Sequence, residues 1–133
     1  MAPLKPALLL HLLIETPASL SFLLAPYKQL PGASPEAKLI LRNFGGLLLS
    51  TNLVCLALLF RKPVDNQLMA MLCACLGTYH VWPIYRAWAR MGAHDVGGKV
   101  GEKVLGGPVV HFVVHVVCLG ALLGSGVVGL LEG

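Results

Sequence analysis

Four long apolar stretches, separated by short polar segments, make up most of this 133-residue chain. A helix needs about 20 apolar residues to cross the hydrocarbon core of a bilayer. The stretches therefore predict four membrane-spanning helices, at approximately residues 4–24, 36–60, 66–90 and 108–131. Because the connections are mostly short, consecutive helices should run antiparallel. We expect an all-α fold, an antiparallel bundle of four transmembrane helices that forms a single membrane domain over residues 1–133.

Residues that stop and start helices mark the boundary between the first two stretches. Pro26 and the turn around Pro31-Gly32 end the first stretch. Ser34 is placed to cap the second helix, and Pro35 suits its first position because proline needs no hydrogen-bond acceptor there. The first two helices are therefore expected to be joined by a tight connection.

The second half of the chain has similar boundary signals. Arg61-Lys62-Pro63 stop the second helix, and Asp65 or Asn66 caps the third. Pro83 predicts a kink in the third helix, because proline removes a backbone hydrogen bond and clashes with the preceding turn. The Gly-rich segment Met91–Gly107 predicts the one long loop.

Small residues indicate where the helices pack. Helix contacts in lipid favour glycine, because two backbones can then approach closely. Gly45-Gly46 and the Gly120-x-x-x-Gly124 spacing, extended by Gly126, are the predicted contact faces.

The composition is typical of a membrane protein and does not favour nucleic-acid binding. Hydrophobic residues make up 56% of the chain and charged residues 12%, whereas soluble domains average about 25% charged residues. The net charge is +4, but the basic residues are spread over loops and helix ends, so we expect no nucleic-acid partner. The four cysteines include no C-x-x-C pair and are interpreted as small buried residues.

The distribution of lysine and arginine predicts the orientation in the membrane. The residues beside the first and third loops are Lys28, Lys38, Arg42, Arg86, Arg90, Lys99 and Lys103. Those beside the termini and the second loop are Lys5, Arg61 and Lys62. Because cytosolic loops carry the excess of positive charge, loops one and three are expected in the cytosol. We expect the membrane to be that of the endoplasmic reticulum.

Polar and ionisable side chains interrupt all four apolar stretches. A charge at the centre of a membrane helix costs at least ~2.5–3.5 kcal/mol, so these residues are candidates for function. The helical rise places Glu15, Tyr79 and His80 about 13–17 Å deep from the side of loops one and three. By the same rise Asn43 and His115 lie about 7–11 Å deep. Residues of all four helices thus share one half of the membrane, which predicts one polar pocket.

These residue types suit proton transfer to and from a lipophilic molecule. Burial and neighbouring charges can adjust carboxylates and imidazoles to acid–base work near neutral pH. Glu15 is the predicted base, and His80, Tyr79 and His115 are predicted acids or orienting groups. Arg42 would keep Glu15 ionised or bind a substrate oxygen. The other predicted substrate-binding residues are Asn43, His11, Trp82, Arg86 and His111.

Several of these residues have a purely structural alternative. Glu15 and Arg42 would form a structural ion pair if neither acts on a substrate. Arg86 would anchor its helix at the membrane surface by extending toward water. Asn43 and Asn52 would hydrogen-bond between helices.

Epoxide opening is the favoured reaction. The attack of water or an internal hydroxyl group needs a base for the nucleophile and an acid for the developing alkoxide. Double-bond isomerisation of a sterol or terpenoid needs the same two roles and is the alternative. The sequence has no nucleophile elbow, phosphate-binding Gly-rich loop or dinucleotide fingerprint. We therefore expect a hydrolase, cyclase or isomerase that uses neither a cofactor nor a metal.

Two segments resemble known families. His11-Leu-Leu-Ile-Glu15-Thr-Pro and Tyr79-His80-Val-Trp-Pro-Ile-Tyr-Arg-Ala resemble small four-helix membrane proteins of fungi, some similar to hydrolases or cyclases of polyketide and terpenoid pathways. The resemblance implies a role in secondary metabolite biosynthesis. The H-x-x-x-E spacing also resembles the acid–base pair of the emopamil-binding sterol isomerases. That implies proton transfer by His11 and Glu15 and cation stabilisation by Trp82, although those enzymes have further acidic residues in their spans.

Two other classes of function remain open. His111 and His115 present two imidazoles on one helical face, and His80 or Glu15 would complete a metal or haem site. A non-enzymatic lipid-binding subunit would need none of these side chains for activity. The expected partners are a lipophilic small molecule and membrane lipid, and the sequence is compatible with a homo-oligomer.

Overall fold

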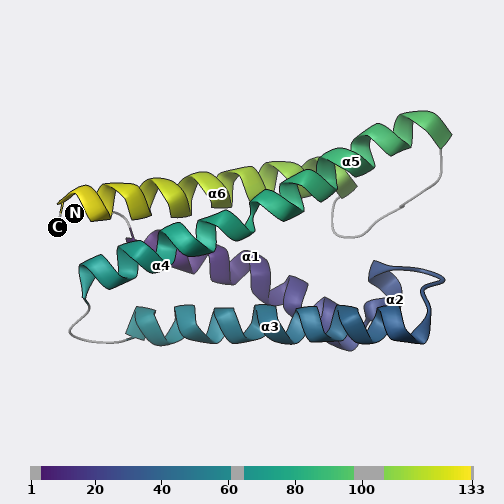
Figure 1. The fold of residues 1–133 in the computed structure, drawn as a ribbon, viewed down its shortest axis with the longest axis horizontal. Coiled ribbons are helices and arrows are strands. Elements are labelled where there is room, and N and C mark those ends of the chain that lie inside the picture. The colour runs from purple at the N-terminus through teal and green to yellow at the C-terminus, as the bar shows by residue number, and fades with distance from the viewer. Residues whose placement is uncertain (1–3, 61–64, 98–106, 133) are drawn as a thin grey trace. The chain divides into compact units, whose positions relative to one another are not determined.

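The computed structural model describes residues 4–60, 65–97 and 107–132, without the side chains of residues 93–97. Its elements are α1 (Leu4–Leu24), α2 (Pro26–Gln29), α3 (Pro35–Phe60), α4 (Asn66–Tyr79), α5 (Val81–Gly97) and α6 (Gly107–Glu132) (Figure 1). Over these residues the structure contains helices and no strand, so the predicted all-α fold is confirmed.

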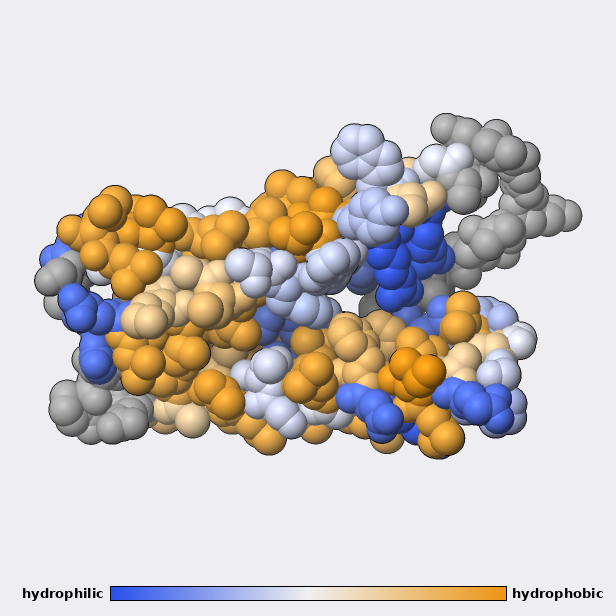
Figure 2. Space-filling model, viewed as in Figure 1, coloured by the Kyte–Doolittle hydropathy of each residue, from blue (hydrophilic) through white to orange (hydrophobic). Residues whose placement is uncertain are grey.

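Four helical stretches in the described part of the chain are long and apolar enough to cross a membrane. They are Leu4–Leu24, Pro35–Phe60, Asn66–Gly92 and Gly107–Glu132, each within two residues of its predicted ends. Figure 2 shows hydrophobic residues over much of the visible face of these helices. Leu13 and Leu47, for example, are 66% and 65% exposed. The protein is an integral membrane protein, because exposed apolar side chains of this extent are stable against lipid.

The chain divides into two compact units. One consists of Leu8–Val64 and the other of Met1–Ala7 with Asp65–Gly133. Each has its own helix packing, and we refer to them as the α1–α3 unit and the α4–α6 unit.

In the α1–α3 unit, α1 and α3 run antiparallel. Asn52 Nδ2 donates a hydrogen bond to Thr16 Oγ1 at 3.2 Å, and the rings of Phe22 and Phe44 meet edge to face at 5.1 Å between centroids. A Cβ on Gly45 would lie 2.8 Å from Phe22 Cβ, so only glycine allows this approach. The predicted helix contact at Gly45 is therefore confirmed.

The connection between α1 and α3 contains the short helix α2 and a tight turn. Gly32 adopts φ 75°, a left-handed conformation that a residue with a Cβ rarely takes. Ser34 Oγ accepts a hydrogen bond from the N–H of Ala37 at 3.2 Å. This bond confirms Ser34 as the N-cap of α3.

In the α4–α6 unit, α4 and α6 pack closely through small residues. A Cβ on Gly126 would lie 2.8 Å from both Ala70 O and Ala74 N. Gly77 leaves similar room for Leu123, whose Cγ would lie 2.8 Å from an added Cβ. Residue numbers rise along α4 as they fall along the facing part of α6, so the two helices are antiparallel.

The other predicted glycine contacts are not formed. A Cβ on Gly120, Gly124 or Gly46 would meet nothing within 4 Å. The spacing Gly120-x-x-x-Gly124 lies on the outward side of α6, whereas Gly126 faces α4. Within each unit the prediction was wrong for these three positions, because helical spacing shows which residues share a face but not which face is buried against the neighbouring helix.

The third membrane span is broken at His80 and not at Pro83. Pro83 has no N–H for the carbonyl of Tyr79, so α4 ends at Tyr79 and the chain tightens there. The N–H of His80 donates to Gly77 O at 3.0 Å, and the N–H of Ile84 donates to His80 O at 3.1 Å. The kink thus lies one turn before the proline that causes it.

Of the remaining predicted helix boundaries, one is confirmed, one was wrong and one lies outside the described residues. Asp65 Oδ1 accepts from the N–H groups of Gln67 and Leu68 at 3.0 and 3.2 Å, which confirms it as the N-cap of α4. Helix α5 continues to Gly97, so the predicted loop Met91–Gly107 was wrong over its first residues. The rest of that loop with Lys99 and Lys103, and the predicted stop at Arg61-Lys62-Pro63, lie outside the described residues.

All four cysteines are described, and none forms a disulfide bond. Cys55, Cys73 and Cys118 are buried, as predicted. Cys75 is exposed on α4, so the prediction was wrong there.

Candidate functional site

Three histidines of the α4–α6 unit form a row of hydrogen-bonded rings, which we call the imidazole chain. His80 Nδ1 lies 2.8 Å from His115 Nδ1, and His115 Nε2 lies 3.1 Å from His111 Nε2. Both separations are hydrogen-bond distances. His80 is 0% and His115 3% exposed, whereas His111 is half-buried near the start of α6. The imidazole chain therefore connects a fully buried ring with a partly exposed one.

Helix geometry explains why these three rings meet. His111 and His115 are one turn apart on α6, so their side chains lie on the same face, with ring centroids 4.4 Å apart. His80 occupies the break between α4 and α5, and the antiparallel packing brings it level with His115, at 5.1 Å between centroids. The sequence predicted each residue as a candidate but could not predict the bond between His80 and His115, which depends on the helix register.

The two bonds of His115 restrict the positions of the protons. A neutral imidazole has one N–H donor and one acceptor nitrogen. His115 uses both nitrogens, so when neutral it donates to one neighbour and accepts from the other. A neutral imidazole chain consequently has two polarities. Either His80 carries its proton on Nε2 and all bonds run from His111 toward His80, or His111 carries its proton on Nδ1 and all bonds run the other way.

Tyr79 and two arginines adjoin the imidazole chain. The ring of Tyr79 meets that of His80 edge to face at 5.2 Å. Arg86 interacts electrostatically with Arg90 and Tyr79, and both arginines interact with His111. The predicted acids Tyr79, His80 and His115 are thus in one place, next to predicted binding residues.

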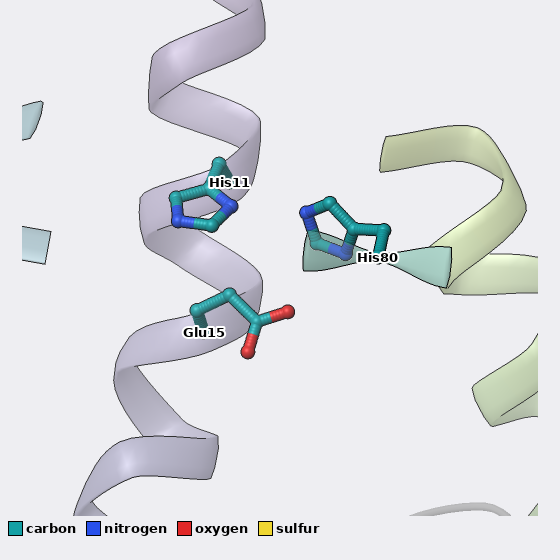
Figure 3. Close-up of side chains that lie close together, drawn as sticks. All are labelled: His11, Glu15 and His80. Carbon is teal, nitrogen blue, oxygen red and sulfur yellow. The ribbon is translucent and has the colours of Figure 1, made fainter. Parts of the chain in front are cut away.

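A second set of polar residues lies on α1. His11, Glu15 and Ser19 are spaced one turn apart and are 1%, 1% and 0% exposed. Figure 3 shows His11 and Glu15 on successive turns of α1 with their side chains on the same side of the helix. Ser19 Oγ donates to Thr16 O at 2.8 Å. The predicted polar face of α1 is therefore present and buried.

Asn52 continues the polar set of the α1–α3 unit from α3. The bond from its Nδ2 to Thr16 Oγ1 is the interhelical hydrogen bond that the sequence predicted. Its Oδ1 is buried and finds no hydrogen-bond partner in the described part of the chain. A buried acceptor without a hydrogen bond lowers the stability of the folded protein, because it has lost its hydration without gaining a partner.

Arg42, Asn43 and Trp82 are exposed, with Trp82 at 71%. Arg42 forms no ion pair with any described residue, so the predicted pairing of Arg42 with Glu15 was wrong. The substrate-binding roles of Arg42, Asn43 and Trp82 stay predictions, as does a pocket shared by all four spans.

The imidazole chain does not converge on one metal ion. Zinc binds histidine nitrogens at about 2.0–2.1 Å in a tetrahedral arrangement, so two nitrogens bound to the same ion lie about 3.3 Å apart. His115 faces His80 with Nδ1 and His111 with Nε2, on opposite sides of its ring. One ion therefore cannot bind all three through these facing atoms. A path for proton transfer, in contrast, would use all of these facing nitrogen atoms.

No family model matches the sequence, and neither a curated protein nor a solved structure matches it. The resemblances to fungal pathway proteins and to sterol isomerases remain predictions.

Proposed function

We propose that the protein is a membrane-embedded enzyme that performs acid–base chemistry on a lipophilic molecule, with the opening of an epoxide by water or an internal hydroxyl group as its reaction. The observation that carries this proposal is the imidazole chain. Imidazole donates and accepts protons near neutral pH, and the chain links a ring inside the apolar body with a partly exposed one. A buried acid without such a link would have to exchange its proton through lipid.

The acid step uses one polarity of the imidazole chain. His80 gives its Nε2 proton to the epoxide oxygen as the C–O bond breaks. His80 Nδ1 then takes the proton of His115 Nδ1, and His115 Nε2 takes that of His111 Nε2. His111 Nδ1 takes up a proton from water, so the chain stays neutral with its polarity reversed.

The base step reverses this sequence. The nucleophile forms its bond to carbon and loses one proton to His80 Nε2, and His111 Nδ1 returns one proton to water. No net proton is consumed, as hydrolysis and cyclisation of an epoxide require. Glu15 on α1 is a second candidate base, and Tyr79 would orient the ring of His80 through their edge-to-face contact.

Isomerisation of a double bond is the second candidate, because the same two steps protonate one carbon and deprotonate another. The same observation supports it, and only the products distinguish the two reactions. In the cell we place the protein in the endoplasmic reticulum with loops one and three in the cytosol, on the basis of the lysine and arginine distribution.

The test uses the purified full chain in lipid nanodiscs with epoxidised methyl ricinoleate, which carries both an epoxide and a hydroxyl group, and a terpenoid olefin as probes. We expect turnover of the epoxide, with incorporation of oxygen from heavy-oxygen water if the reaction is hydrolysis and none if it is cyclisation. His80→Gln should lower turnover about 100-fold or more, the usual contribution of an acid–base group. Tyr79→Phe should lower it less, and Tyr85→Phe, at a ring that is 68% exposed, should leave it unchanged.

Two results would contradict the proposal. One is full turnover by a correctly folded His80→Gln variant. The other is a wild-type protein that converts neither probe while it binds both, which would favour a lipid-binding subunit.

A further inference from the structure

Two arginines and a histidine gather where α5 passes the first turns of α6. Arg86 and Arg90 are one turn apart on α5 and share a face of that helix. They interact electrostatically with each other and with His111. The ring contact between Trp88 and Phe112, at 6.5 Å between centroids, places α5 beside α6 at this level. We call Arg86, Arg90 and His111 the basic cluster.

No acidic side chain among the described residues neutralises the basic cluster. Arg86 and Arg90 form no ion pair or hydrogen bond there. The described acids of the same unit, Asp65 and Glu132, lie at the start of α4 and the end of α6, which is the other end of these antiparallel helices. Like charges one turn apart repel each other. The cluster is therefore a place where an anion would be stabilising.

The start of α6 adds to the positive potential. The first N–H groups of a helix have no partner within the helix, and its dipole is positive at this end. Helix α6 has 26 residues, and His111 lies near its start. The dipole of α6 and the two guanidinium groups therefore both attract an anion.

Exposed aromatic residues of α5 indicate the depth of the basic cluster. Tyr85 and Trp88, toward the end of the third span, are both 68% exposed. Tryptophan and tyrosine collect at the level of the lipid head groups, where a ring contacts lipid and its polar atom contacts water. The basic cluster on the same helix is therefore at the depth of lipid phosphates.

We infer that the basic cluster binds the phosphate monoester group of a membrane amphiphile. Each guanidinium offers a planar pair of donors that fits two phosphate oxygens. A phosphate monoester carries a charge of about −1.5 to −2, which balances two arginines. A diester head group has one negative charge and should bind more weakly, and a zwitterionic head group more weakly still. The site shares His111 with the imidazole chain, but phosphate binding by Arg86 and Arg90 does not depend on the proposed acid–base reaction.

The test is a binding titration of the full chain in phosphatidylcholine nanodiscs. The probes are short-chain phosphatidic acid, short-chain phosphatidylglycerol and inorganic phosphate. We expect saturable binding of phosphatidic acid, weaker binding of phosphatidylglycerol and much weaker binding of inorganic phosphate. Arg86→Gln with Arg90→Gln should weaken phosphatidic acid binding about tenfold or more, as the loss of charge-assisted hydrogen bonds requires.

A matched control separates a specific site from general attraction. Lys28→Gln with Lys38→Gln removes the same net charge from the α1–α3 unit and should change the Kd by less than about twofold, because the two lysines would contribute only a salt-screened general attraction and no paired donors to the phosphate. Arg86→Lys with Arg90→Lys keeps the charge but not the planar donors, and should give an intermediate Kd. It also serves if the Gln variant fails to fold.

Three outcomes would overturn the inference in whole or in part. Equal weakening by the Gln variants of the arginines and of the lysines would show general attraction only. Equal binding of phosphatidic acid and phosphatidylglycerol would exclude a monoester site. Inorganic phosphate that binds as tightly as phosphatidic acid would assign the ligand to a soluble phosphate and exclude the amphiphile.

Discussion

At the scale of single residues, His115 has the most constrained side chain of the candidate site. Both of its ring nitrogens take part in hydrogen bonds, to His80 at 2.8 Å and to His111 at 3.1 Å. It is 3% exposed, so water cannot readily replace a lost partner. Its chemistry follows from its neighbours, because each proton movement on one side of the ring requires a movement on the other.

We expect His115→Phe to weaken both stability and turnover. The phenyl ring fills a similar space but leaves His80 Nδ1 and His111 Nε2 unpaired, which should cost about 1–3 kcal/mol of unfolding free energy. It also interrupts the proton path, so turnover should fall about 100-fold or more. Val113→Phe places the same ring on the exposed side of α6, where Val113 is 52% exposed, and should change neither quantity measurably. Equal turnover by His115→Phe and wild type would exclude the relay.

Some residues of the site could be predicted from the sequence, and others could not. An imidazole inside an apolar span is visible in the sequence as an expensive group, so His80, His111 and His115 were found. The hydrogen bond between His80 and His115 was not, since it depends on how α4 and α6 align. Arg42 was assigned to Glu15 from its depth alone, and its exposed position shows that depth does not determine which way a helical side chain points.

At the scale of elements, the break between α4 and α5 positions His80. Pro83 removes the hydrogen bond to Tyr79 O, and the chain tightens at His80 as a result. The sequence predicted the proline effect but placed the kink at the proline, because the lost bond belongs to the carbonyl one turn earlier. The starts of α3 and α4 were predicted well, since caps such as Ser34 and Asp65 are local signals, whereas the end of α5 at Gly97 was not.

Replacement of the proline should separate stability from activity. In Pro83→Ala the N–H of residue 83 can donate to Tyr79 O and straighten the helix, which should add at most the ~3 kcal/mol that proline costs within a helix. The lost hydrogen bond between His80 and His115 should offset about 1–3 kcal/mol of this gain, so the unfolding free energy should change little. The ring of His80 would turn away from His115, and turnover should fall. Thermal unfolding followed by circular dichroism, together with the turnover assay, measures both. Unchanged turnover with increased helicity would show that the break is not needed.

The packing of α4 against α6 can be tested with two glycines of the same helix. A Cβ at Gly126 would lie 2.8 Å from backbone atoms of Ala70 and Ala74, so Gly126→Ala should destabilise the protein by about 1–3 kcal/mol. Gly124 has open space around its Cα, and Gly124→Ala should be neutral or stabilising by up to about 1 kcal/mol. Thermal unfolding in the same nanodiscs compares them. A larger loss for Gly124→Ala would contradict the packing of α6 described above.

At the scale of the whole molecule, each of the four apolar spans contains a small number of buried polar side chains. Among the described residues, the buried polar or charged ones are His11, Glu15, Ser19, Asn52, His80, His115 and Ser125. They are distributed over both compact units, whereas the exposed surface of the helices is largely apolar. A membrane protein retains such costly groups where they have a function. Of these residues, His80 and His115 belong to the imidazole chain, whose hydrogen bonds would allow proton transfer.

The hydrogen bonds of the imidazole chain can be observed directly by nitrogen NMR. The sample is the full chain with isotope-labelled histidine in lipid bilayers. The account predicts scalar coupling across two N···N hydrogen bonds, one between the Nδ1 atoms of His80 and His115 and one between the Nε2 atoms of His115 and His111. Both couplings should disappear in His115→Phe. A spectrum in which His115 shows no coupling to another histidine would contradict the imidazole chain and the proton path proposed from it.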